Sequence, residues 1–301
     1  MRKTFAKLLM EMAAKDDKLV VLIGDISHYL LKEFEEAYPD RFYNVGICEQ
    51  SIISIAAGLA MEGFRPIVHT IAPFCVERAY EQIKVDMCYQ NLDVTIVSVG
   101  GSFDYAHLGC THHCYSDVAI LRALPNMQVY SPGNSDEFKA SFKRVWGNSS
   151  PKYFKLFAKQ HTYKNDEDFK IIKNVNSKFV GNNKSVFVTG HMLDHIIKKI
   201  DDFNTVVYMS TYDTLSKENE LKVANILRES TKGYVFVLEE NLSIGGLGDA
   251  IFNIASENNI SIKMRKLGIK KQFLEEYGSA DQHREKLGLT YNNVCNILED
   301  M

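Results

Sequence analysis

The sequence predicts an α/β protein with a doubly wound, mostly parallel sheet, followed by a smaller α/β domain. Short apolar runs, such as VVLI at 20–23 and TIVSV at 95–99, are separated by segments long enough for a helix. Strands that alternate with helices favour a parallel sheet covered on both faces. A polar segment rich in Lys and Asn interrupts the alternation, so we expect a first domain at 1–160, a linker at 161–184 and a second domain at 185–301.

The individual elements follow from periodicity and from helix-breaking residues. Leu8, Leu9 and Met12 fall at helical spacing and predict a first amphipathic helix. Gly63 ends a second helix, as glycine commonly does. For the first domain we expect helices at 2–14, 50–63, 77–90, 118–124 and 134–147, and strands at 18–25, 65–71, 93–101, 127–132 and 152–157. For the second domain we expect strands at 185–190, 205–210, 234–240 and 261–268, with helices between them.

The composition is that of an ordinary globular protein and excludes several classes of partner. A formal net charge of −3 gives no reason to expect nucleic acid or an anionic membrane. Glu11 interrupts the apolar start of the chain, so the first helix does not resemble a secretory signal. With no such signal and no apolar run of transmembrane length, the six cysteines are expected to be reduced thiols in a cytoplasmic protein.

Glu49 stands at the start of a helix of unusual composition. No charged residue occurs from 50 to 61, and the segment contains Ala56, Ala57, Gly58 and Ala60 beside large aliphatic residues. A carboxylate in a first helical turn is a common capping feature. A helix that is apolar on every side is expected to be buried on every side, however, which places Glu49 in an interior or at an interface. There a carboxyl group can share a proton with a basic ring nitrogen.

The stretch LGCTHHCYSD at 108–117 raises the question of a metal site. Cys110, His112, His113 and Cys114 carry zinc-binding atoms, but one short loop rarely brings four ligands around a tetrahedron, and no second cluster follows. We therefore expect no metal here. The loop follows a strand at the carboxyl edge of the predicted sheet, where doubly wound folds keep their active sites. His112 or His113 is expected to act as an acid, a base or a hydrogen-bond donor.

Aromatic residues follow the predicted strand at 65–71. Phe74, Arg78 and Tyr80 stand at the mouth of that strand, at the same edge of the sheet. They are either core aromatics with a solvated arginine or the wall of a ligand site.

Several ordered motifs resemble one enzyme family. They are GICEQ, IAAGLAMEGFRPI, FCVERAYEQI, GCTHH, LRALPNM and YSPGNSDE in the first domain, and VLEENLSIGGLGDAI and RKLGIKKQFLEEYGS in the second. Together they resemble the pyrimidine-binding and C-terminal domains of thiamine-diphosphate enzymes, above all transketolase and deoxyxylulose phosphate synthase. The resemblance covers nearly all of the chain. It implies a transferase of carbohydrate metabolism that moves a two-carbon ketol unit between sugars with thiamine diphosphate as cofactor.

The resemblance also implies roles for the site residues. Glu49 would hydrogen-bond the pyrimidine nitrogen of the cofactor and thereby activate it. Phe74 or Tyr80 would stack on the pyrimidine, with Arg78 beside them. His112 would contact the donor sugar near its reacting carbonyl, with His113 next to it.

Substrate selectivity departs from the family pattern. Lys159 stands where the family has an arginine that grips a substrate phosphate, and Ser27 or His28 could assist it. A lysine binds phosphate as a point charge but lacks the bidentate fork of arginine. Leu108 occupies the position of an aspartate that binds a sugar hydroxyl, and Cys110 replaces a proline or alanine.

The resemblance extends to a partner chain. The family's diphosphate-binding GDG motif is absent, since IGDIS at 23–27 does not match it. A separate N-terminal-type subunit would therefore hold the diphosphate and Mg²⁺, around a homodimer of this chain that forms the core of a heterotetramer. The alternatives are the beta subunit of a 2-oxo acid dehydrogenase and a non-catalytic partner subunit.

Overall fold

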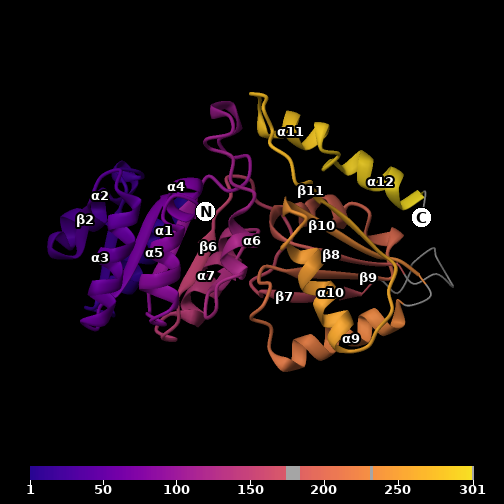
Figure 1. The fold of residues 1–301 in the computed structure, drawn as a ribbon, viewed down its shortest axis with the longest axis horizontal. Helices are drawn as coiled ribbons and strands as arrows, with labels where there is room; N and C mark the ends of the chain where they lie inside the picture. The colour runs from indigo at the N-terminus through magenta and orange to yellow at the C-terminus, as the bar shows by residue number, and fades with distance from the viewer. Residues whose placement is uncertain (174–183, 231–232, 300–301) are drawn as a thin grey trace.

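The computed structural model describes residues 1–173, 184–230 and 233–299. The chain forms two α/β units that lie side by side, each with a central sheet and covering helices (Figure 1). Within the described residues, the first sheet has six strands and the second has five. The fold class predicted from the sequence is confirmed.

Every neighbouring pair of strands in the first sheet runs parallel, in the order β2-β1-β3-β4-β6-β5. The strands are β1 (Leu19–Ile23), β2 (Phe42–Asn44), β3 (Arg65–Ile71), β4 (Thr95–Val99), β5 (Gln128–Tyr130) and β6 (Lys152–Lys155). All residues of β1 and β4 are buried, as continuous apolar runs require in a sheet covered on both faces. Because the strands are parallel, their carboxyl ends meet at one edge.

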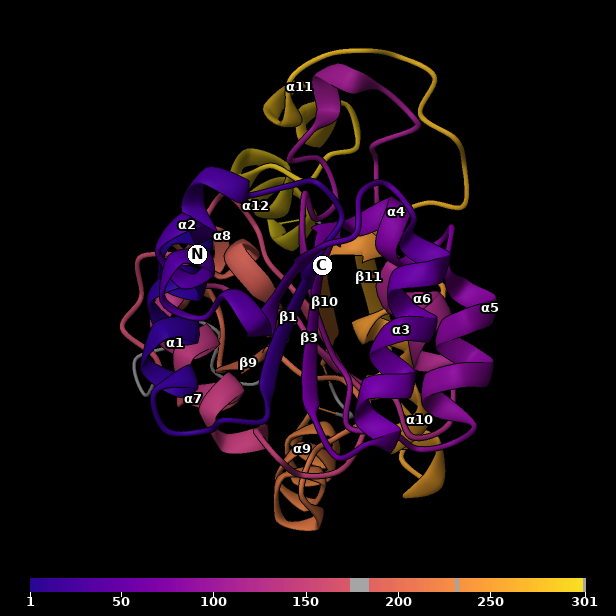
Figure 2. The same cartoon turned by 90° about the vertical axis from the view of Figure 1, so that its left-hand side faces the viewer.

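Helices cover both faces of this sheet (Figure 2). One layer contains α1 (Arg2–Ala13), α2 (His28–Ala37) and α7 (Ser135–Val145); the other contains α3 (Glu49–Met61), α4 (Ala72–Val76), α5 (Tyr80–Gln82), the π-helical turns η2 (Ile83–Cys88) and α6 (Asp117–Arg122). A side-chain cap fixes where α7 begins. The Asn134 side chain accepts hydrogen bonds from the backbone N–H groups of Asp136 and Glu137 and so caps α7.

Two helical predictions differ from the structure. The helix expected at 77–90 is shorter, since helical structure runs from Tyr80 to Cys88 and becomes π-helical from Ile83. Helix α2 is not among the helices expected from the sequence, because its buried face consists only of Leu31 and Phe34 and gives a short periodic signal. Single turns of 3-10 helix lie at Pro39–Arg41 (η1) and Ala106–Leu108 (η3).

The composition of α3 suggests a helix that is buried on every side, but one side of α3 is exposed. Ala56 and Ala57 pack into the core of the same chain, whereas Ser54, Ile55 and Gly58 are exposed, Ile55 by 44%. The small residues of α3 therefore lie on two different sides of the helix. Its alanines serve the internal core, and its glycine lies on an outer face with Ser54 and Ile55.

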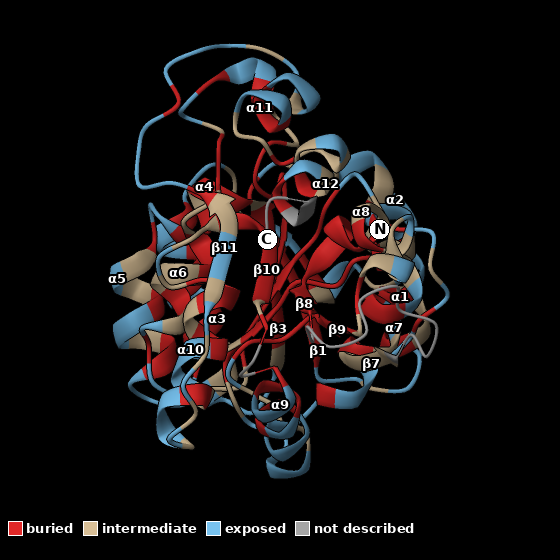
Figure 3. Ribbon diagram, turned by 90° about the vertical axis from the view of Figure 1, so that its right-hand side faces the viewer, coloured by how far each residue is buried: buried red, intermediate tan, exposed pale blue. Residues whose placement is uncertain are grey.

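The second unit is a five-stranded sheet in the order β11-β10-β8-β9-β7. Its strands are β7 (Phe169–Lys173), β8 (Ser185–Val188), β9 (Thr205–Met209), β10 (Val235–Leu242) and β11 (Met264–Ile269). Its α-helices are α8 (Leu193–Ile197), α9 (Lys217–Glu229), α10 (Leu247–Glu257), α11 (Ala280–Lys286) and α12 (Tyr291–Glu299), with 3-10 turns η4 (Gly190–Met192) and η5 (Ile200–Asp202). Strands β8, β9 and β10 are buried, and the edge strand β11 is only partly buried (Figure 3).

The segment 161–184, predicted as a linker, contributes to the second sheet. Its residues 169–173 form β7, which pairs antiparallel with β9. Residues 174–183 of the predicted linker lie outside the described part of the chain.

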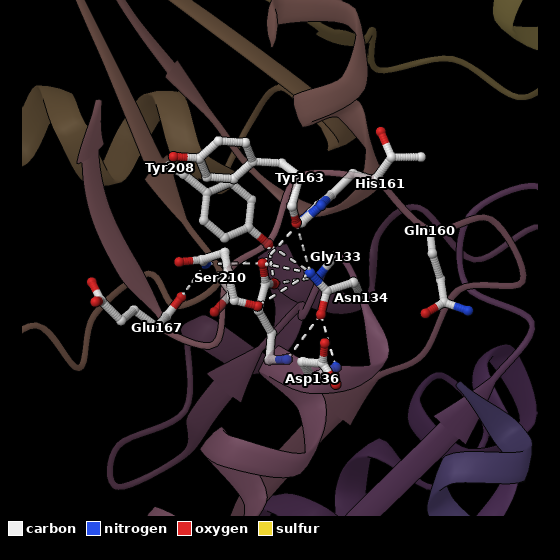
Figure 4. A network of polar contacts seen from close by, with 12 residues as sticks. Gly133, Asn134, Asp136, Gln160, His161, Tyr163, Glu167, Tyr208 and Ser210 are labelled. Atoms are coloured by element: carbon white, nitrogen blue, oxygen red, sulfur yellow. Dashed lines mark hydrogen bonds and ion pairs between the residues drawn. The ribbon is translucent and has the colours of Figure 1, made fainter. Parts of the chain in front are cut away.

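Both units share one apolar core and one polar network. The largest cluster of buried apolar side chains includes Ile52 and Tyr153 from the first unit and Met209, Leu227 and Ile251 from the second. Nearby, the carboxylate of Glu137 on α7 accepts hydrogen bonds from both units; Figure 4 shows the donors around it. In the described part of the chain, no helix is both long and apolar enough to cross a membrane.

Candidate active site

Glu49 lies at the carboxyl edge of the first sheet, as the first residue of α3. Its side chain is 2% exposed, and its Oε2 accepts a hydrogen bond from Arg78 Nη1 at 2.7 Å. Its Oε1 accepts from Thr70 Oγ1 at the long distance of 3.4 Å. The Thr70 side chain packs against Gly24, because a Cβ atom at position 24 would lie only 2.9 Å from Thr70 Oγ1. Glu49 is therefore a buried carboxylate with one firm partner and one weakly occupied oxygen.

A chain of contacts leads from Glu49 through Arg78 and Phe74 to His112. The Arg78 guanidinium lies 4.4 Å from the centroid of the Phe74 ring, a cation–π distance. The His112 ring lies 5.0 Å from Phe74 in an edge-on arrangement. The structure thus brings together four residues that the sequence assigns to the site, from α3, from α4 and its following loop, and from the loop after β4.

The two histidines of the loop have different surroundings. His112 is partly exposed, and its Nδ1 lies 2.9 Å from Thr111 Oγ1. His113 is buried and its Nε2–H donates to the Ala106 carbonyl at 3.3 Å. Burial lowers the pKa of both imidazoles, so both are neutral at pH 7. His112 is the one that faces Phe74 and can contact a ligand there.

Tyr80, His28 and Lys159 lie apart from Glu49. The Tyr80 hydroxyl donates to the Ile120 carbonyl, and its ring lines a separate cavity with Cys88 and Leu124. His28 Nε2 faces Glu35 of its own helix at 3.6 Å. Lys159 Nζ lies 3.8 Å from Asp281 Oδ1 and is partly exposed. Of the two aromatic residues proposed to stack on a ligand ring, Phe74 is the one in contact with Arg78, the partner of Glu49.

Ser27 belongs to a hydrogen-bonded chain that the sequence does not reveal. Arg2 Nη2 donates to Ser27 Oγ at 2.8 Å, and Ser27 Oγ lies 2.8 Å from His69 Nε2. His69 Nδ1 lies 2.7 Å from the Val97 carbonyl and must donate to it, so Nε2 accepts from the serine. Ser27 adopts a left-handed conformation with φ of 61°, a strained geometry that clusters at functional sites.

A cavity of about 420 Å³ opens at the same edge of the sheet, with Arg2, Lys3, Asp104, Tyr105 and Gln160 in its lining. Asp104 accepts a hydrogen bond from the Ala158 backbone, and burial raises its pKa to about 7. Sequence reasoning missed Arg2, because an arginine in a first helical turn is usually solvated. It also missed Asp104 and Tyr105, although both lie in the loop that carries His112.

The buried imidazole of His69 gives a direct spectroscopic prediction. Burial lowers its pKa to about 4, so His69 stays neutral in the folded protein above that pH. An unfolded chain takes up this proton below about pH 6.5, so His69 contributes stability that is present above pH 6.5 and lost as the pH falls toward 4. We expect the His69 ring signals to stay constant in NMR spectra between pH 5 and 8, and to titrate in urea. A folded-state titration near pH 6.5 would contradict the assigned hydrogen bonds.

The cysteine and histidine side chains of the stretch at 108–117 lie in different surroundings. Cys110 is exposed, Cys114 is fully buried, and His112 and His113 have separate contacts. Among the residues that the structure describes, no group of three or more His, Cys, Asp and Glu side chains is arranged to hold a metal ion.

We expect protein dialysed against a mild chelator to carry no stoichiometric zinc in metal analysis. Cys110→Ser should change the free energy of unfolding by less than about 0.5 kcal/mol, as exposed substitutions usually do. Cys114→Ser is the matched comparison and should be destabilising, because the thiol is fully buried and a hydroxyl in its place would need a hydrogen-bond partner. Tightly held zinc that is lost in Cys110→Ser would overturn this interpretation.

A parallel α/β sheet with a buried glutamate, an aromatic ring and a histidine at its carboxyl edge defines a ligand-binding domain of the doubly wound class. Residues 1–163 match the transketolase pyrimidine-binding domain, and the chain belongs to this family. Transketolase-family proteins use thiamine diphosphate.

Relatives of similar length are components of transketolase-type enzymes. The chain is 29% identical to the 6-deoxy-6-sulfo-D-fructose transketolase subunit of Clostridium sp. strain MSTE9, over 100% of this chain and 94% of the relative. It is 28% identical to one of the subunits of the apulose-4-phosphate transketolase of Phocaeicola vulgatus, over 98% and 95%. It is also 30% identical to 1-deoxy-D-xylulose-5-phosphate synthase of Pelotomaculum thermopropionicum, over 97% of this chain but 46% of that enzyme.

Solved structures show the same architecture. A split-gene transketolase, solved as an inactive beta4 tetramer, superimposes with a TM-score of 0.82 at 29% identity, covering 99% of this chain and 97% of the other. Transketolase from Campylobacter jejuni superimposes with a TM-score of 0.78 at 15% identity, over 100% of this chain and 46% of the other, and this likeness concerns the fold alone.

Proposed function

We propose that this chain is the C-terminal subunit of a thiamine-diphosphate-dependent transketolase-type enzyme, which transfers a two-carbon ketol unit between sugars. The observation that carries the proposal is the buried Glu49 at the carboxyl edge of the sheet, with Phe74 and His112 beside it. Family membership and relatives of similar length named as transketolase subunits support it.

The residues at this edge fit the pyrimidine end of the cofactor. Glu49 offers a carboxylate oxygen whose contact with Thr70 is long, so it can take a stronger partner. Phe74 offers a flat apolar surface, one side of which lies against the Arg78 guanidinium. Thiamine diphosphate, when bound, supplies the electron sink for cleaving and forming a carbon–carbon bond next to a carbonyl.

In this proposal Glu49 holds and shares the activating proton. A carboxyl group in a site closed to water transfers a proton to a ring nitrogen more readily than an exposed one. Arg78 now holds the carboxylate through Oε2, and because it is 38% exposed it can move without leaving an empty core. Its withdrawal would leave Glu49 free to bind the ring nitrogen.

His112 is proposed to contact the donor sugar. It is neutral because burial lowers its pKa, so its ring can donate one hydrogen bond and accept another. Its edge-on contact with Phe74 places the ring beside the aromatic surface proposed to bind the cofactor. Leu108, which is 44% exposed in the same loop, presents an apolar surface instead of a carboxylate that could bind a hydroxyl.

We infer that the sugar carries an anionic group. Arg2 and Lys3 line the cavity of about 420 Å³, and Arg2 donates to Ser27. Lys159, Ser27, His28 and His113 remain proposed substrate-binding residues, and Tyr80 remains a proposed alternative to Phe74 for stacking on the cofactor. Two relatives are named for sugars that bear a sulfo or a phosphate group, which supports an anionic substrate here.

A partner chain completes the proposed site. We assign the cofactor's diphosphate and Mg²⁺ to an N-terminal-type subunit, with two copies of this chain at the centre of a heterotetramer. The outer face of α3, with Ser54, Ile55 and Gly58, lies on the other side of the helix from the buried Glu49, and Gly58 there allows the close approach that such an interface needs. Nothing lies within 4 Å of a Cβ atom built on Gly58.

Co-expression with an N-terminal-type transketolase subunit tests the proposal. We expect the purified chain alone to show no ketol transfer and weak thiamine diphosphate binding in titrations with Mg²⁺, and the co-purified complex to convert phosphorylated ketoses. Ile55→Glu should abolish self-association in mass measurements, whereas the exposed Leu221→Glu on α9 should not. A persistent monomer that binds no partner, or tight cofactor binding by this chain alone, would contradict the proposal.

A further inference from the structure

A segment of the second unit crosses the loop that carries His112. The strap, residues 270–287, includes α11, and the histidine loop is residues 102–115. In Figure 2 the histidine loop and α11 lie together above the sheets, and α11 contacts the 3-10 turn η3 within the loop. The two segments come from different units of the fold, so their contact joins the candidate active site to the second unit.

Three rings form the centre of this contact. His283 of the strap stacks on Phe103 of the loop, with centroids 5.3 Å apart and planes 15° apart. The same imidazole meets His113 edge-on at 4.9 Å. Phe103, His113 and His283 are all 4% exposed or less. His113 is adjacent to His112, so a shift of this ring stack moves the proposed sugar-binding histidine.

A second contact lies at Gly109. A Cβ atom on Gly109 would come within 2.7 Å of the Tyr277 ring, so one edge of this ring lies against the loop backbone, while the side chain as a whole is 77% exposed. Gly109 also has a φ of 75°, which glycine adopts without strain. Its carbonyl accepts from the backbone N–H groups of His112 and His113, at 3.0 and 3.2 Å. Tyr277 therefore rests on the turn from which both histidines are held.

The strap is itself firmly anchored. Arg284 donates to both carboxylate oxygens of Glu240 on β10, and both side chains are buried. Burial raises the pKa of Glu240, but His191 and Arg284 outweigh it and lower the pKa to about 2, so the pair stays charged. A capping box of Ser279 and Gln282 fixes the start of α11. The strap can therefore act as a rigid support.

Ring packing, more than hydrogen bonding, holds the histidines here. His113 Nδ1 and His283 Nε2 are buried, and neither has a hydrogen-bond partner. Burial also lowers the pKa of both rings. Two neutral imidazoles with unused nitrogens behave as flat aromatic surfaces, so ring shape is what this position requires.

We propose that His283 and Tyr277 are positioning residues, which hold the histidine loop so that His112 faces Phe74. The inference rests on the proposed function for its catalytic consequence, but the bracing itself is independent of any activity. It gives the second unit a part in a site whose other residues all belong to the first.

Thiol labelling tests the bracing without an activity assay. Cys114 is fully buried within the histidine loop, and Cys75 is fully buried in α4, so each labels only when its own surroundings open. In His283→Ala and Tyr277→Ala, we expect iodoacetamide to modify Cys114 at least about tenfold faster than in the wild type, with Cys75 unchanged. His283→Phe, which keeps a flat ring, should restore the slow rate. Equal acceleration at both cysteines, or no acceleration at Cys114, would overturn the proposal.

Kinetics of the complex with its partner chain test the catalytic consequence. With fructose 6-phosphate as the probe donor, His283→Ala and Tyr277→Ala should lower kcat by about tenfold or more, because a misplaced contact residue loses alignment. Apparent thiamine diphosphate affinity should stay within about twofold, since Glu49 and Phe74 lie on other elements. Phe252→Ala on α10, an aromatic that is 56% exposed, is the matched control and should leave kcat unchanged.

The two experiments separate the two ideas. If the wild-type complex shows no turnover, the proposed function fails, while the labelling result still decides the bracing. If the complex turns over and His283→Ala has normal kcat despite faster Cys114 labelling, the catalytic part of the inference is wrong.

Discussion

Glu49→Gln is expected to abolish turnover by the complex while leaving the fold intact. The amide keeps the shape of the side chain but cannot donate and recover a carboxylic proton. A loss of at least about 10³-fold in kcat corresponds to roughly 4 kcal/mol of barrier, a normal effect for a group that acts in the mechanism. Steady-state rates of the complex and circular dichroism of the chain measure the two halves of this expectation.

The control is a glutamate that is exposed and lies outside the candidate active site. Glu257→Gln, exposed at the end of α10, should leave the rate within about twofold of wild type. Arg78, which holds Glu49 through Oε2, is unsuitable as a control because it belongs to the same site. A Glu49→Gln enzyme within tenfold of wild type would remove Glu49 from the mechanism.

Glu137→Gln is expected to lower the free energy of unfolding strongly. The buried Glu137 carboxylate accepts from the Gly133 backbone at 2.7 Å, His161 Nε2 at 2.8 Å and the Tyr208 hydroxyl at 2.5 Å. Asn134 and Asn165 donate to it as well. An amide would set its own N–H groups against these donors and leave some of them unpaired in the interior.

The expected cost is about 3 kcal/mol or more, the usual range for breaking one member of a buried charged network. Urea denaturation should show a lower midpoint with an unchanged dependence of the free energy on urea concentration. Glu257→Gln again serves as the control and should move the free energy of unfolding by less than about 0.5 kcal/mol. If Glu137→Gln lowered the free energy of unfolding by less than about 1 kcal/mol, the charge of Glu137 would contribute little to stability, and this prediction would be wrong.

Much of the fold could be predicted from local patterns. The apolar runs of β1 and β4 and the amphipathic spacing of α1 are strong signals, because each element buries several residues. Helix α2 buries only Leu31 and Phe34, and its signal is too short to detect. Strand β7 falls within the predicted linker because its sequence, FKIIK, is short and lies in a polar stretch.

Some residues of the candidate site could likewise be predicted from the sequence, and others could not. Glu49, Phe74, Arg78 and His112 can be predicted as site residues, because motif order and the edge of a parallel sheet place them near one another. Arg2, His69 and Asp104 could not be found in this way, since their contacts join segments distant in sequence. The exposed side of α3 is also hidden from the sequence, because apolar composition alone does not say which surfaces a single chain covers.

The shared apolar core has a consequence for how this protein can be divided. Tyr153 of the first sheet and Met209, Leu227 and Ile251 of the second unit belong to one continuous cluster of buried side chains. A cut after the last strand of the first sheet would open that cluster on both sides and expose apolar surface on each fragment. The two units are therefore expected to melt together in a single cooperative transition, and the boundary near residue 163 marks an inherited sequence module more than a separable folding unit.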